Sequence, residues 1–178
     1  MVAFDPGTDP GRDVAFRLMA DGFVTLFRRH EVLADTVAWL VAHGYRVVRL
    51  DASRWASEAD LHRDVARALD LPASYGANLD ALNDCLRDVE AYGYGSSVAT
   101  TGLILVFDGY HRFAARCPGP AQAVLDIVAV RARSAALVGH RMLCLVQSDD
   151  PDIGFAPVGA TPVSWNPAEW PRAARRPD

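Results

Sequence analysis

The spacing of apolar and polar residues divides most of the chain into predicted helices and strands. Two nearly continuous apolar runs of strand length, at 102–107 and 141–146, are typical of strands that are covered on both faces. A third strand is predicted at 45–50. Apolar residues at helical spacing predict helices over 31–43, 57–70, 79–91, 110–115 and 120–137. Strands that alternate with helices favour parallel pairing through right-handed crossovers, so the pattern predicts an α/β domain whose parallel sheet is flanked by helices.

The first 44 residues predict an extension of this core. Residues 1–13 are rich in proline, glycine and aspartate, and we expect them to form a loose arm. Apolar residues at 16–19 and 23–27 flank an Asp-Gly pair, which favours a β-hairpin. With the helix that follows, residues 14–44 therefore predict a β-hairpin and βα unit that adds a parallel strand to the edge of the core sheet. Structural reinforcement is the simpler role for this unit, and a second binding surface or regulatory module is the alternative.

The last part of the chain, residues 148–178, is rich in proline and contains Trp165 and Trp170. The prolines argue against long elements, whereas the tryptophans favour a segment that packs on the domain. The sequence thus divides into an arm, an extension, a core of alternating strands and helices, and this tail.

The predicted helix at 79–91 has two opposed faces. Its apolar residues fall on one side: Leu79, Leu82, Cys85, Leu86 and Val89. Asp80, Asp84 and Asp88 fall on the other side, each one turn from the next. Like charges at this spacing repel by roughly 0.2–0.5 kcal/mol per pair, so a helix built only for stability would place a cation in the row. The acidic face therefore suits a positively charged partner, and a solvated surface is the alternative.

Composition narrows the class of protein. Of the 178 residues, 51% are apolar and the net charge is -4, which fits a globular protein and does not favour a nucleic-acid ligand. No apolar run approaches the ~18 residues that cross a bilayer, and the first residues do not resemble a secretory signal. Three scattered cysteines suit neither a disulfide framework nor a zinc site, so we expect a cytoplasmic protein.

Residues that could carry catalysis do not form a recognisable pattern. The five histidines show no metal-ligand spacing, and no Ser-His-Asp or Cys-His arrangement stands out. A surface row of aspartates is also a poor place to raise a carboxyl pKa for acid–base chemistry. We therefore expect no enzyme activity, no catalytic residue, no metal site and no cofactor.

The stretch 71–86 closely resembles the signature of the barstar family, the intracellular protein inhibitors of secreted guanyl-type ribonucleases. The matching residues are Leu71, Pro72, Tyr75, Gly76, Asn78, Leu79, Asp80, Ala81, Leu82, Asp84, Cys85 and Leu86. The resemblance covers about 45–147. It implies a helix and preceding loop that plug the ribonuclease active site, where carboxylates take the place of RNA phosphates. An aspartate of barstar is itself a known example of an extreme interface hot spot.

The resemblance also assigns roles to single residues. Asp84 matches the central acidic contact and Asp80 the second one. Asn78 and Gly76 match loop contacts at the same interface, and Tyr75 matches a tyrosine expected mainly to pack. Asn78 has the alternative role of N-cap, and we expect Gly76 to serve the backbone conformation before it serves close approach.

Some positions depart from the family pattern. Ser74 replaces one member of an aromatic pair, and Asn83 replaces a tryptophan beside the critical aspartate. Both are expected at the partner surface, whereas the role of Asp88 stays open. A later acidic contact falls at Val130, with Asp126 one turn earlier.

Two functional hypotheses follow. The first is a cytoplasmic inhibitor or immunity protein, monomeric when free, that blocks a barnase-like secreted ribonuclease. The second, favoured by the changes at Ser74 and Asn83, is a barstar-like interaction module that binds a different basic protein.

Overall fold

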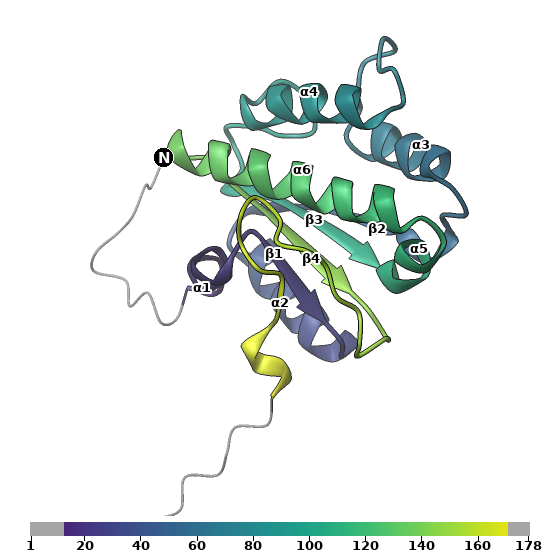
Figure 1. Cartoon of the computed structure of the whole chain (residues 1–178). Helices are drawn as coiled ribbons and strands as arrows, with labels where there is room; N and C mark the ends of the chain where they lie inside the picture. Colours follow the sequence, from purple (N-terminus) through teal and green to yellow (C-terminus); the bar gives the residue numbers. More distant parts are fainter. Residues whose placement is uncertain (1–12, 171–178) are drawn as a thin grey trace, which may run out of the picture.

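The computed structural model describes residues 13–170, which form a five-stranded parallel sheet between two layers of helices (Figure 1). The strands lie in the order β2-β3-β4-β1-β5. Their bounds are β1 Val24–Phe27, β2 Tyr45–Asp51, β3 Gly102–Asp108, β4 Arg141–Gln147 and β5 Ser164–Trp165. Every neighbouring pair is parallel. The predicted α/β fold with a parallel sheet is confirmed.

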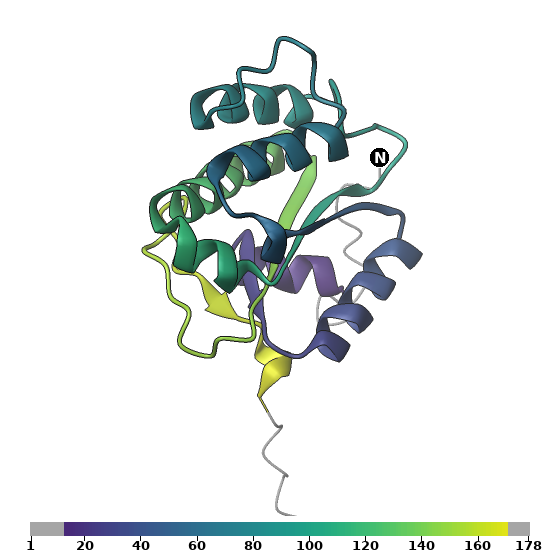
Figure 2. The same ribbon diagram turned by 90° about the vertical axis from the view of Figure 1, so that its right-hand side faces the viewer.

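The helices are divided between the two faces of this sheet. Their bounds are α1 Val14–Asp21, α2 His30–Ala42, α3 Glu58–Ala68, α4 Leu79–Glu90, α5 Tyr110–Arg116 and α6 Pro118–Leu137. Helices α1 and α2 cover one face, and α3 to α6 cover the other (Figure 2). Within the described part of the chain, none of the helices combines the length and the apolar character that a membrane span requires.

The side chains of β3 show why its sequence is apolar throughout. Leu103, Leu105 and Phe107 join the core beneath α3 to α6. Ile104 and Val106 point the opposite way and join a second core beneath α1 and α2. All five are at most 2% exposed, because each face of the strand meets its own layer of helices.

The predicted hairpin at the start of the extension is wrong, because residues 14–21 form α1 instead. Asp13 caps this helix by accepting a hydrogen bond from the Phe16 amide at 3.0 Å. Ala15 and Leu18, three positions apart, both bury against the second face of the sheet. Gly22 takes a φ of 135° directly after the helix, so the Asp-Gly pair ends a helix rather than turning a hairpin. The predicted arm lies outside the described residues except for Asp13.

The parallel strand expected from the extension is present. Strand β1 pairs with β4, on the opposite side of the sheet from β2. It is not left as an edge, because β5 pairs along its other side.

The C-terminal segment is fastened to the start of α2. The Glu169 carboxylate accepts hydrogen bonds from the backbone amides of Arg28 at 3.0 Å and Arg29 at 3.3 Å. These amides belong to the two residues that directly precede α2, where a carboxylate also suits the positive end of the helix dipole. These contacts join residues about 140 positions apart and hold the segment that contains β5 beside the end of β1.

Truncation of Leu33 tests whether the extension is an integral layer of the fold. Leu33 on α2 is 0% exposed in the second core. We expect Leu33→Ala to lower the free energy of unfolding by about 2–5 kcal/mol in urea denaturation, because it removes buried contacts and leaves a cavity. Val41→Ala on the same helix, where the side chain is 56% exposed, should change it by less than about 0.5 kcal/mol. Equal effects of the two substitutions would show that α2 does not cover a core.

Candidate functional site

Helix α4 is anchored by one face and exposed on the other. Leu82, Leu86 and Val89 are at most 1% exposed and belong to the core that α6 also lines. Figure 1 shows α4 on the outer side of α6, away from the sheet. Asp80 and Asp84 lie on the exposed side of α4. The amphipathic pattern therefore fixes the helix and presents its carboxylates to solvent.

The first turn of α4 is capped by its own sequence. The Asn78 side-chain oxygen accepts a hydrogen bond from the Ala81 amide at 2.8 Å, so Asn78 is the N-cap. Its side-chain nitrogen is directed at the Gly76 carbonyl at 3.4 Å. Asp80 follows in the first turn, where the helix dipole stabilises a negative charge. Among residues 13–170 the Asp80 carboxylate has no hydrogen-bond or ion-pair partner.

The loop before α4 is tied to α3 through a buried histidine. The Tyr75 hydroxyl is hydrogen-bonded to Nδ1 of His62, and Nε2 of His62 lies 3.1 Å from Glu58 Oε1. His62 is 1% exposed, and burial raises the pKa of the Tyr75 hydroxyl above its usual value. Tyr75 thus packs and positions the loop. Helix α3 is itself held by a capping box, in which Asp60 accepts the amide hydrogen of Ser57 at 3.1 Å.

The constraint at Gly76 differs from the expectation. Gly76 does not adopt a positive φ; the left-handed conformation falls instead on Ala77, with a φ of 48°. A Cβ at Gly76 would lie 3.3 Å from the side-chain nitrogen of Asn78 and 3.5 Å from the Cβ of Ala81. A side chain at Gly76 would therefore need only a small shift of the Asn78 amide, and a positive φ is not what places glycine here.

Asp84 makes an ion pair within α4 that the sequence analysis missed. Arg87 lies one turn along the helix, and its guanidinium is 3.0 Å from Asp84 Oδ1. The Asp84 side chain is nevertheless 67% exposed and that of Arg87 57%, so the pair is worth at most about 1 kcal/mol. The i,i+3 spacing alone could have revealed it. Asp84 is therefore available to a partner that can displace one weak intramolecular contact.

Asp88, the third member of the acidic row, is occupied by the loop that follows α4. Its Oδ2 accepts a hydrogen bond from the Tyr94 hydroxyl, and its main-chain carbonyl accepts one from Gly93. The hydrogen bond to this carboxylate raises the pKa of Tyr94 above its usual value. Asp88 therefore differs from Asp80 and Asp84, because its carboxylate is already engaged by a side chain of the following loop.

The same loop is held by His140. His140 is 1% exposed, with Nδ1 3.1 Å from the Glu90 carbonyl and Nε2 3.0 Å from Ser96 Oγ. Burial lowers the pKa of this imidazole. The neutral form can then join the two segments by donating one hydrogen bond and accepting the other.

The remaining positions singled out from the sequence differ in accessibility. Ser74 is exposed in the loop and Asn83 is half-buried on α4. Val130 is 36% exposed on α6. Asp126, its possible replacement as an acidic contact, accepts a hydrogen bond from the Gly159 amide at 2.8 Å and so anchors the C-terminal segment. In the part of the chain that the structure describes, no group of three or more histidine, cysteine or acidic side chains could hold a metal ion.

Comparison with known proteins places this arrangement in a family. Residues 45–147, more than half of the chain, match the sequence model of the family described as Barstar (barnase inhibitor). The chain belongs to the barstar family. Members of this family are inhibitors rather than enzymes, and they bind a ribonuclease as a protein partner. No curated protein matches the chain.

The limits of the barstar match coincide with elements of the fold. The matched region begins at the first residue of β2 and ends at the last residue of β4. These strands and β3 between them form one side of the sheet, and β1 and β5 continue it on the other. Helices α1 and α2 also lie outside the match, so the second layer of helices is formed by residues that the family model does not cover.

Replacing Ala77 tests the strain in the loop before α4. A left-handed conformation costs a non-glycine residue roughly 1–2 kcal/mol, whereas glycine adds about 0.5–1 kcal/mol of entropy to the unfolded chain. We therefore expect Ala77→Gly to raise the free energy of unfolding by about 0.5–1 kcal/mol in urea denaturation. Ala73→Gly makes the same chemical change in the same loop, where φ is not positive, and should lower it. Destabilisation by both substitutions would mean that Ala77 is not strained.

Proposed function

We propose that this protein inhibits a guanyl-type, barnase-like ribonuclease by placing the exposed face of α4 in the enzyme's active site. The observation that carries the proposal is the pair of accessible carboxylates, Asp80 and Asp84, on a helix whose opposite face is fixed in the core. The family match supports the same class of partner.

The physical basis is mimicry of a phosphate backbone. An enzyme that cleaves RNA must hold phosphates with cationic side chains. A carboxylate offers those cations oxygen acceptors that are negatively charged, as the phosphate oxygens are. Because α4 is packed by Leu82, Leu86 and Val89, the backbone that carries the carboxylates is already ordered before they bind. An acidic surface also speeds the capture of a basic protein at low salt.

The proposed roles follow from the resemblance of 71–86 to the barstar signature, and the accessibility of each residue supports them. Asp84 is the central ligand of the enzyme's cations, and Asp80 binds beside it. Gly76, Ser74 and the side-chain nitrogen of Asn78 supply the loop contacts. The further surface residues proposed are Asn83 next to Asp84, Tyr75 as the residue that positions the loop, and Asp88 at the periphery because Tyr94 engages it.

The setting we propose is the cytoplasm of a cell that secretes the ribonuclease, where the inhibitor acts as an immunity protein. Cys85, Cys117 and Cys144 are all free thiols, which suits a reducing compartment.

Truncation of Asp84 tests the proposed orientation of α4. We expect the unaltered protein to inhibit a barnase-like ribonuclease stoichiometrically, and Asp84→Ala to weaken binding by at least about 100-fold, because the enzyme's buried cations would lose their central acceptor. Titration calorimetry measures the affinity of the unaltered protein and of the Asp84 variant for the ribonuclease, each at two salt concentrations. Asp35→Ala removes an exposed acid from α2, on the other face of the sheet, and should leave affinity nearly unchanged. An Asp84 variant that binds as tightly as the parent contradicts this orientation, and a parent that leaves RNA cleavage undiminished contradicts the function.

The ion pair with Arg87 gives a prediction of opposite sign. Arg87→Ala removes both a competitor for Asp84 and a positive charge that repels a cationic site. We expect affinity for the ribonuclease to rise about two- to five-fold, as the loss of one exposed ion pair allows. Arg17→Ala, an equal change in charge on α1, serves as the control. Weaker binding of the Arg87 variant would mean that Arg87 itself contacts the partner.

A second function is favoured by the small polar residues Ser74 and Asn83. The first is exposed and the second half-buried, so neither offers the large apolar anchor that tight interfaces usually contain. The alternative is an interaction module that directs the same acidic face to a basic protein other than a ribonuclease. Affinity capture from the cytoplasm followed by mass spectrometry separates the two, since one recovers a small ribonuclease and the other an unrelated basic protein.

A further inference from the structure

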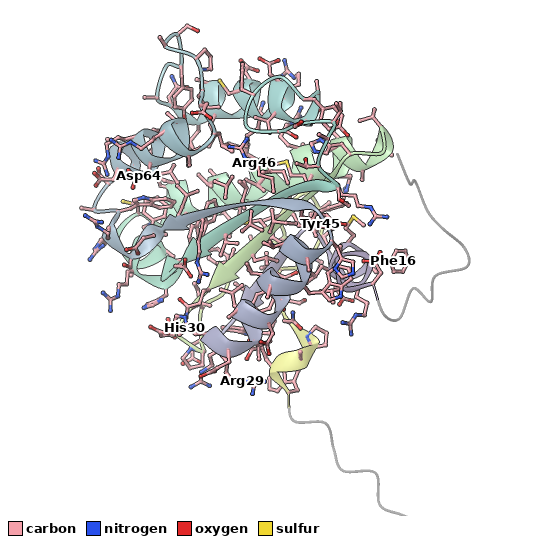
Figure 3. The ribbon with its side chains drawn as sticks, turned by 180° about the vertical axis from the view of Figure 1, so that it is seen from behind. Phe16, Arg29, His30, Tyr45, Arg46 and Asp64 are labelled. Carbon is pink, nitrogen blue, oxygen red and sulfur yellow. The ribbon has the colours of Figure 1, made fainter. Side chains whose placement is uncertain are left out.

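The connections that leave the carboxyl edge of the sheet from the two strands on either side of β4 run to opposite faces. The chain that leaves β1 passes to α2 on one face, whereas the chain that leaves β3 passes to α5 on the other (Figure 2). In open parallel sheets a change of this kind opens a crevice beyond the carboxyl ends of the strands, where ligands commonly bind. Figure 3 shows His30, which follows β1, at one end of α2 and Tyr45, which begins β2, near the other.

A cavity of about 440 Å³ lies at this edge of the sheet. Its lining includes His30 after β1, Asp51 at the end of β2, His111 and Arg112 from α5, and Asp149 after β4. The volume lies within the range of sites for small molecules. No residue of α4 lines the cavity, so it is separate from the proposed ribonuclease-binding face.

Two side chains at the cavity, one cationic and one a hydrogen-bond donor, are available to bind a ligand. Arg112 is exposed, and its guanidinium has no hydrogen-bond or ion-pair partner among residues 13–170. His111 accepts the amide hydrogen of Asp149 through Nδ1 at 3.3 Å. In the neutral ring the proton is then on Nε2, which can donate it to a ligand. Arginine in particular offers the planar fork that matches phosphate oxygens.

Two carboxylates at the cavity each keep one oxygen available. Asp51 uses Oδ1 for the backbone and hydroxyl of Ser53, and Asp149 uses Oδ1 for the Gln147 side chain at 2.8 Å. Their Oδ2 atoms accept no hydrogen bond from any residue that the structure describes. Asp108, by contrast, is closed off, because both its oxygens are bound by Arg49 at 2.6 and 2.8 Å.

The floor of the cavity is rigid. Gln147 is 1% exposed and accepts the Gly109 amide hydrogen at 2.8 Å while it donates to Asp149. A Cβ at Gly109 would come within 2.7 Å of the Ser53 Cβ, so the turns after β2 and β3 lie too close together to admit a side chain there. Hydrogen bonds therefore hold Asp51, Asp149 and His111 in place, and the exposed Arg112 can turn toward the anion of a ligand that also carries hydroxyl groups.

We propose that this crevice binds a small phosphorylated polyol, of the class of a sugar phosphate or nucleoside monophosphate. Arg112 and His111 hold the phosphate, and the carboxylates of Asp51 and Asp149 accept hydrogen bonds from the hydroxyls. The extension contributes His30, at the start of α2, to the lining of this site, and the four proposed ligand residues lie in the barstar domain or directly after it.

Two-dimensional NMR of the full chain, titrated with ribose 5-phosphate, tests the proposal. We expect saturable shifts at the turns after β1, β2, β3 and β4, and an affinity at least ten-fold higher than that for ribose or inorganic phosphate alone. Arg112→Ala should weaken binding at least ten-fold, and Asp51→Asn should weaken it too. Neither variant should change ribonuclease inhibition, because neither residue lies on α4.

Arg67→Ala is the matched control, since Arg67 is an exposed arginine on α3 that does not line the cavity. It should leave the affinity for ribose 5-phosphate unchanged. The proposal is overturned if ribose 5-phosphate produces no saturable shifts, if inorganic phosphate binds equally well, or if the Arg67 variant loses affinity as the Arg112 variant does.

Discussion

The burial of β3 and β4 on both faces is the constraint on which the rest of this structure depends. Each buried aliphatic side chain contributes roughly 1.5–3 kcal/mol, but only where a second layer excludes water. Leu103 and Leu105 obtain that cover from α3 to α6, and Ile104 and Val106 obtain it from α1 and α2. The barstar region supplies the first layer and the N-terminal extension the second.

The same layering determines what α4 can offer a partner. Because α6 already covers the sheet beneath it, α4 needs only one apolar stripe to be held in place. Its remaining surface is exposed to solvent and carries Asp80 and Asp84. Asn78 caps the first turn of the helix, and Tyr75 fixes the loop before it. Rigid placement of the carboxylates is thus a product of core packing and local capping, and the repulsion between them is small by comparison.

Local sequence signals predicted much of this arrangement. Continuous apolar runs identified β3 and β4, and the pattern of Leu82, Leu86 and Val89 identified the buried face of α4. The β-hairpin was wrong because an Asp-Gly pair suits a helix end as well as a turn, and only the burial of Ala15 and Leu18 distinguishes the two.

Features that depend on distant parts of the chain could not be predicted in this way. Glu169 binds the backbone amides just before α2 across about 140 residues, and Asp126 anchors the C-terminal segment through the Gly159 amide. The crevice at the carboxyl edge depends on four strands and on which face each connection takes. Sequence spacing carries no information about such contacts until the topology is known.

Hydrogen–deuterium exchange of the protein with and without a barnase-like ribonuclease is the most direct test of the central claim, that the exposed side of α4 is the inhibitory surface. The account predicts slower exchange in the loop at 71–78 and in the first turns of α4, with α1 and α2 unchanged. Protection confined to α1, α2 or the C-terminal segment, with the loop and α4 unaffected, would contradict it.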